Sequence, residues 1–164
     1  MSRVEVADRI LTAAGELFVR DGVDGPGMGE VARSAGCSRA TLYRHFTDRQ
    51  ALLDAFARRE AAAIGAEVAA RTAGLHGRAR LVEGVLATLA AVRAREHLTA
   101  WYAHGTDTLH RVLGEEVLAA FGQTPADADR GAWVLRVVLS FLTLPEDDAA
   151  RERLLIEKFL LPGG

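Results

Sequence analysis

A break between two short helical segments constrains this fold more than any other feature of the sequence. Residues 28–35 carry apolar side chains at helical spacing, and Gly36 then interrupts the pattern. Glycine can adopt the turn conformation that a β-carbon resists. Ser38 follows as an N-cap, because its hydroxyl can accept a hydrogen bond from the free amides that open residues 39–46. The sequence therefore predicts two short helices joined by a tight turn.

The second of these helices has distinct inner and outer faces. Leu42 and Phe46 lie one helical turn apart and are expected to bury it. The outward residues combine cations, hydroxyls and rings: Arg39, Ala40, Thr41, Tyr43, Arg44 and His45. Cations and hydroxyls suit DNA phosphates, and arginine and threonine also suit base edges. Arginines on an arbitrary helix would be read as a solvated face, but this spacing favours a DNA-binding helix-turn-helix.

The charge of the chain restricts where nucleic acid could bind. The formal net charge is −2 at pH 7, which argues against a protein that coats nucleic acid over its whole surface. Residues 33–49, in contrast, contain several arginines and have Asp48 as their only acid. A DNA contact must therefore come from this local positive patch.

The rest of the chain also reads as helical, with no stretch of strand alternation. Further helices are predicted over residues 7–21, 48–73, 78–94, 96–104, 107–121, 127–143 and 146–161. The predicted fold class is all-α with about nine helices. It comprises an N-terminal three-helix helix-turn-helix head, residues 1–47, and a larger helical C-terminal body, residues 48–164.

The penultimate predicted helix is apolar nearly all round, which indicates burial on two sides. The body can cover one face with its own core, so the opposite face is expected to meet a second subunit. The last helix offers another apolar surface. The predicted homodimer interface comprises Trp133, Val134, Val137, Val138, Phe141, Leu155 and Phe159.

Several other classes of protein are disfavoured. Cys37 is the sole cysteine, and no signal-like or membrane-spanning apolar run is present, so a cytoplasmic protein without a membrane anchor is expected. Cys37 is read as a small buried hydrophobe rather than a redox sensor. His97 and His104 could hold a metal only with help from Asp107 or His110, and hydrogen-bonded histidines without metal or cofactor are favoured. No nucleophile–base pair, paired carboxylates or phosphate loop supports an enzyme.

The N-terminal motif resembles that of the TetR family of bacterial regulators over about residues 5–60. The matching positions are Val31, Ala32, Ala35, Gly36, Ser38, Thr41, Leu42, Tyr43, His45, Phe46, Arg49, Leu52 and Leu53. The resemblance implies phosphate contacts for Tyr43 and His45, and a backbone contact for Arg49. It implies base or phosphate contacts for Arg39, Ala40, Thr41 and Arg44. The family usually has threonine at Gly27, so a weaker cap on the first helix of the motif is expected.

The same resemblance implies a ligand-responsive repressor that binds a palindromic operator as a dimer and is released by a small molecule. The implied site for a mostly apolar effector lies among central helices, at Leu86, Leu89, Trp101, Tyr102, His104 and Leu113. Such residues also fill any helical core. A constitutive TetR-like repressor, or a protein-interaction regulator without an effector, remains the alternative.

Overall fold

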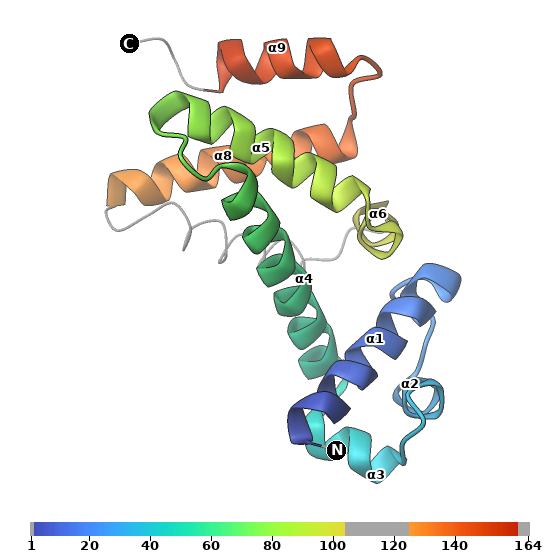
Figure 1. Cartoon of the computed structure of the whole chain (residues 1–164). Coiled ribbons are helices and arrows are strands. Elements are labelled where there is room, and N and C mark those ends of the chain that lie inside the picture. The colour runs from blue at the N-terminus through green and yellow to red at the C-terminus, as the bar shows by residue number, and fades with distance from the viewer. Residues whose placement is uncertain (1, 104–124, 161–164) are drawn as a thin grey trace. The chain divides into compact units, whose positions relative to one another are not determined.

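The computed structural model describes residues 2–103 and 125–160, and within these ranges it contains helices and no strand. The helices are α1 (Arg3–Asp21), α2 (Met28–Ser34), α3 (Arg39–His45), α4 (Arg49–Arg71), α5 (Gly77–Arg93), α6 (Glu96–Ala103), α8 (Pro125–Thr143) and α9 (Ala149–Phe159) (Figure 1). The predicted all-α class is confirmed. The helix predicted over residues 107–121 lies outside the described residues.

The chain divides into two compact units. The first comprises Met1–Glu60 and Glu96–Val112, and the second comprises Ala61–Arg95 and Leu113–Gly164. The backbone therefore passes from the first unit to the second within α4 and returns to the first immediately before α6. The functional boundary between residues 47 and 48 remains a prediction.

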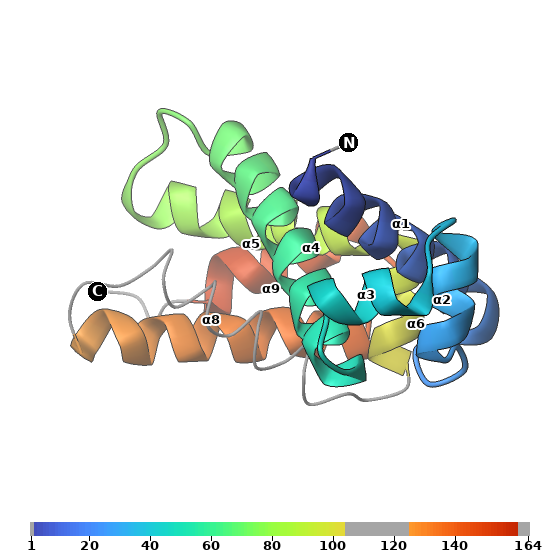
Figure 2. The same cartoon turned by 90° about the horizontal axis from the view of Figure 1, so that it is seen from below.

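The first unit is built around two aromatic rings. Phe18 on α1 and Phe56 on α4 are both fully buried and meet edge to face, with ring centroids 5.2 Å apart. Gly15 allows this approach, because a β-carbon there would lie 3.0 Å from Cε2 of Phe56. Helix α1 also packs against α2 and α6. This core supports the short helices α2 and α3, which lie beside α1 and the start of α4 (Figure 2).

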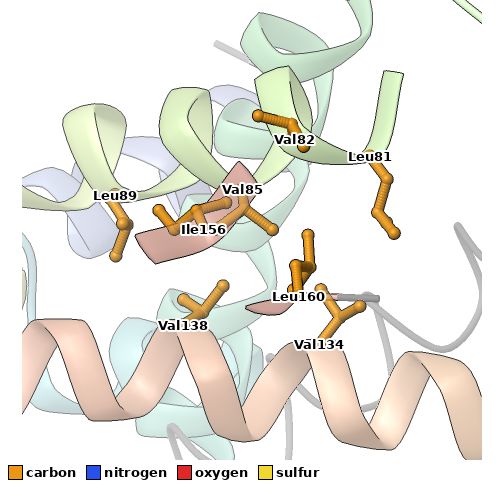
Figure 3. Packing of buried hydrophobic residues seen from close by; sticks show 8 residues of the cluster. All are labelled: Leu81, Val82, Val85, Leu89, Val134, Val138, Ile156 and Leu160. Carbon is orange, nitrogen blue, oxygen red and sulfur yellow. The ribbon is translucent and has the colours of Figure 1, made fainter. Parts of the chain in front are cut away.

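The second unit has an aliphatic core in which α5, α8 and α9 meet. Its buried members are Leu81, Val82, Val85, Leu89, Val134, Val138, Ile156 and Leu160 (Figure 3). An ion pair borders this core: Arg93 on α5 contacts the buried carboxylate of Glu152 on α9 at 2.7 Å. The Arg93 guanidinium also donates to the Phe141 carbonyl of α8. One side chain thus joins all three helices.

The helix ends follow their capping residues. Asp48 accepts a hydrogen bond from the Ala51 amide at 2.8 Å, as expected for the residue that opens α4. The predicted start of the last helix at residue 146 was wrong, because the cap is Asp148, which accepts from the Ala150 amide. None of the described helices is long and apolar enough to cross a membrane.

Candidate nucleic-acid interface

The turn between α2 and α3 has the predicted geometry. Gly36 has φ +61°, a left-handed conformation that favours glycine. The amides of Gly36 and Cys37 donate to the Arg33 and Ala32 carbonyls at 3.1 and 2.9 Å, which closes the end of α2. Cys37, which was predicted to be a small buried hydrophobe, is half-buried, because it lies in this turn and not on an inward helical face. The turn thus fixes where α3 begins.

Helix α3 is capped and anchored as its sequence requires. The Ser38 hydroxyl accepts from the Thr41 amide at 3.1 Å and lies 3.0 Å from the Thr41 hydroxyl. Leu42 is fully buried, and the buried Phe46 follows one turn later. These anchors prevent the helix from rotating about its axis. The opposite side chains must therefore face away from the core.

The predicted DNA-binding residues differ in how far they reach solvent. Tyr43 is 47% exposed, Ala40 and Arg44 are exposed, and Thr41 and His45 are half-buried. Together with the exposed Arg39 they form what we call the α3 face. The structure therefore brings six of the seven predicted DNA-binding residues onto one short helix. In the part of the chain that the structure describes, the Tyr43 and Arg44 side chains are exposed to solvent.

Arg49, the seventh predicted residue, has an intramolecular partner. Its guanidinium donates to the Val23 carbonyl in the segment between α1 and α2. This bond ties the first residue of α4 to the loop that precedes α2. Sequence reasoning did not anticipate it, because nothing in the local pattern indicates which carbonyl a distant arginine will meet.

Two further features around α2 were not predicted. Gly27 is the N-cap of α2 and provides no side-chain hydrogen bond, as expected, but the neighbouring Gly29 lies directly against the Arg39 guanidinium. Glu30 on α2 accepts from Arg20 of α1 at 2.8 Å. The glycines in the sequence do not indicate the contact between Gly29 and Arg39, because that contact depends on the fold of the turn.

The predicted interface residues of the second unit separate into two groups. Val134 and Val138 are only 2% and 4% exposed and point from α8 toward α5 in the core (Figure 3). Their assignment to a subunit interface is therefore corrected, because α5 and α9 already cover them. The other predicted residues line an apolar groove of about 430 Å³ between α8 and α9. They are Trp133, Val137, Phe141, Leu155 and Phe159. The lining is completed by Arg136, Ser140, Ile156 and Leu160.

The predicted effector residues are only partly described. Leu89 is buried in the core of the second unit, and Leu86 packs against that core. Trp101 and Tyr102 belong to α6, but their side chains, together with His104 and Leu113, lie outside the described residues. An effector site among these residues remains a prediction.

His97, considered above as a metal ligand, is hydrogen-bonded instead. Its Nε2 lies 3.0 Å from Oε2 of the buried Glu60, and its ring meets Phe56 edge to face. Arg59 contacts the same carboxylate at 3.2 Å. The hydrogen bond to His97 is the main reason that the pKa of Glu60 lies below its usual value, against the opposing effect of burial. In residues 2–103 and 125–160, no cluster of three or more His, Cys, Asp or Glu side chains could hold a metal ion.

Glu60→Gln is expected to destabilise the first unit at neutral pH by about 1–3 kcal/mol, because it removes the charge from the buried carboxylate that is hydrogen-bonded to His97 and Arg59. A lowered pKa in the folded state gives stabilisation that is present above the unfolded pKa and is lost as the pH falls through the folded value. The difference between wild type and variant should therefore shrink below about pH 4.3. Thermal melting from pH 7 to pH 3 measures it.

The matched control is Glu83→Gln, which breaks an exposed ion pair with Arg153 in the second unit. Such pairs contribute little to stability, so this variant should melt close to wild type. Equal effects of the two substitutions, or a Glu60 effect that does not change with pH, would contradict the assignment.

The α2–turn–α3 arrangement, with a buried hydrophobic side and an exposed basic side, defines the class of helix-turn-helix DNA-binding proteins. A family model described as "Bacterial regulatory proteins, tetR family" matches residues 10–56. An HTH-type transcriptional regulator of Mycobacterium tuberculosis is 39% identical over 172 residues, covering 95% of this chain and 84% of that protein. The chain belongs to the TetR family, and is thus a transcriptional regulator with a DNA-binding helix-turn-helix and not an enzyme.

Solved structures share the fold across nearly the whole chain. The TetR-family repressor AlkX from Dietzia sp., implicated in the biodegradation of n-alkanes, has a TM-score of 0.63 at 22% identity, with 94% of this chain and 95% of AlkX covered. AibR in complex with isovaleryl coenzyme A and operator DNA has a TM-score of 0.56 at 17% identity, with 93% and 94% covered. These likenesses extend the family fold beyond the helix-turn-helix into the second unit.

Proposed function

We propose that this chain is a cytoplasmic, ligand-responsive repressor that binds a palindromic operator as a homodimer. The observation that carries the proposal is that Leu42 in α3 and Phe46 directly after it are buried, whereas most of the α3 face, including Tyr43 and Arg44, is exposed. A helix held in this way can enter the major groove with its outer side chains against the bases. Residues 1–47, together with Arg49 at the start of α4, would then bind DNA, and the rest of residues 48–164 would bind effector and partner.

The α3 face divides into two kinds of contact under this proposal. Tyr43 and His45 contact phosphates, which position the protein without reading sequence. Arg44 and Thr41 contact base edges, and Ala40 offers a methyl group to a thymine. Arg49 contacts the backbone beside α4 and is oriented by its bond to the Val23 carbonyl.

The dimer places two α3 helices on successive turns of one DNA face. We assign the subunit contact to the groove between α8 and α9, because it combines an apolar lining with large exposed side chains. A two-fold axis between the subunits makes the operator an inverted repeat, with half-sites about 34–36 Å apart.

A mostly apolar small molecule is the effector in this proposal. AibR, which shares the fold, binds both isovaleryl coenzyme A and operator DNA, and this supports a fold able to hold the two ligands. A ligand releases DNA only through different affinities for the two conformations of the dimer. We place its site near Leu86, Leu89, Trp101, Tyr102, His104 and Leu113.

Reciprocity between the two ligands provides the test. A compound that weakens operator binding about 5–150-fold must itself bind more weakly by the same factor when the operator is saturating, since one coupling free energy of about 1–3 kcal/mol governs both. Calorimetric titration of branched-chain acyl-coenzyme A and long-chain alkane probes, with and without DNA from its own promoter, measures the factor. If every probe bound with the same affinity in the presence and in the absence of operator DNA, a constitutive repressor would be favoured.

A further inference from the structure

The first residue of α3 folds back over α2. Gly29 is the second residue of α2, and a β-carbon at this position would lie 2.5 Å from Nη2, 2.7 Å from Nε and 2.8 Å from Cζ of Arg39. Such distances are far below van der Waals contact, so the guanidinium occupies the space in which any other residue would place its side chain. We call this space the Gly29 seat.

Among the described residues, the polar side chains next to Gly29 and Arg39 in sequence have partners other than Arg39. Glu30, the nearest acid along α2, has its carboxylate in contact with Arg20 at 2.8 Å. At the start of α3, the Ser38 and Thr41 hydroxyls lie within hydrogen-bond distance of each other. The Arg39 side chain is exposed. The Arg39 guanidinium therefore lies on the first turn of α2, where it can bind an anionic group that approaches from solvent.

The position of this cation distinguishes two roles for Arg39. In a helix-turn-helix the second helix lies in the major groove, and the first helix crosses the sugar–phosphate backbone. A guanidinium that lies on the first helix is thus directed to the backbone rather than to base edges. We propose that Gly29 is a positioning residue that makes Arg39 a phosphate contact and not a base reader. This inference rests on the proposed function of the α3 face.

The test is Gly29→Ala, which fills the seat with a methyl group. The guanidinium must move, and it can do so cheaply because it is the end of a flexible side chain. The helix itself should gain slightly, since alanine is the better helix former. We expect weaker binding to operator and to an unrelated duplex by the same factor. Arg39→Ala should reduce the magnitude of the slope of log affinity against log salt concentration by about 0.9 for each phosphate that the protein no longer neutralises. Gly29→Ala should produce part of the same reduction.

The double variant makes the test specific. If Gly29 acts only through Arg39, then Gly29→Ala should have no further effect on DNA affinity in the Arg39→Ala background. Gly65→Ala in α4 is the matched control, because among the described residues no atom beyond the adjacent residues and the helix's own backbone lies within 4 Å of its added β-carbon. It should leave DNA affinity and salt slope unchanged. Melting curves for each variant verify that the fold is intact.

Three results would overturn the inference: an unchanged salt slope in Gly29→Ala, additive losses of affinity in the double variant, or a relaxed base preference in Arg39→Ala. None of these would affect the proposed function as long as Tyr43 and Arg44 remain essential for DNA binding. Loss of that dependence, in contrast, would remove the function on which the inference rests.

Discussion

Replacing Phe159 by arginine is expected to yield a monomer that binds its operator about 10²–10⁴-fold more weakly. Phe159 is 61% exposed and lines the groove between α8 and α9 together with Trp133 and Phe141. A large aromatic side chain in this position is well suited to the centre of an interface. An arginine would be buried there without a partner charge, which opposes association. A monomer then binds only one half-site and loses the additional affinity that a dimer gains by binding two half-sites at once.

Light scattering at micromolar concentration gives the mass of each variant, and gel shifts compare the full inverted repeat with a single half-site. Leu144→Arg is the matched control, because Leu144 is 77% exposed but does not line the groove. It should remain dimeric and bind normally. A wild-type mass of one chain, or a dimeric Phe159→Arg variant, would contradict the interface.

Val138→Arg is unsuitable as a probe, because Val138 is a core residue whose replacement would unfold the second unit.

The second large effect is expected on the α3 face. Arg44→Ala should cost about 1–3 kcal/mol of operator binding and relax base preference at one position of each half-site, if Arg44 makes a bidentate bond to a base. Tyr43→Ala should weaken binding to all sequences alike, because phosphates carry no sequence information. The double variant should lose at least the larger of the two contributions. Neither change should lower the melting temperature by much, since both side chains are exposed.

Gel shifts at several salt concentrations, on the operator and on scrambled DNA, separate the two roles. Arg151→Ala in the second unit removes the same charge from an exposed position and serves as the control. Its binding should match that of wild type. Unchanged operator affinity in the Tyr43→Ala, Arg44→Ala double variant would refute the assignment of α3 as the recognition helix.

The parts of the fold that depend on neighbours in sequence were predictable. Gly36 and Ser38 specify the turn and the cap through their own backbone and hydroxyl, so the predicted start of α3 agrees with the structure. The last helix shows the limit of the same reasoning. Three acidic residues, Glu146, Asp147 and Asp148, follow Pro145, and the structure shows that Asp148 is the cap.

Features that depend on distant contacts were not predictable. A helix that is apolar nearly all round does not reveal which face is internal, and the prediction for α8 therefore placed core and surface residues in one interface. Glu60 and His97 are separated by 37 residues, and Arg93 and Glu152 by 59. No periodicity in the sequence links such pairs, because their contact is created by the packing of whole helices.

The residues that hold α3 in the fold differ from those that it exposes to solvent, and this has an evolutionary consequence. Leu42 and Phe46 hold the helix in the fold, whereas Ala40 and Arg44 are exposed. Mutations at exposed positions usually change stability by less than about 0.5 kcal/mol. After gene duplication, a copy of this regulator could therefore acquire a new target sequence through changes at Ala40 and Arg44 without passing through an unfolded intermediate. Divergence of specificity would be limited by the available promoters rather than by the tolerance of the scaffold.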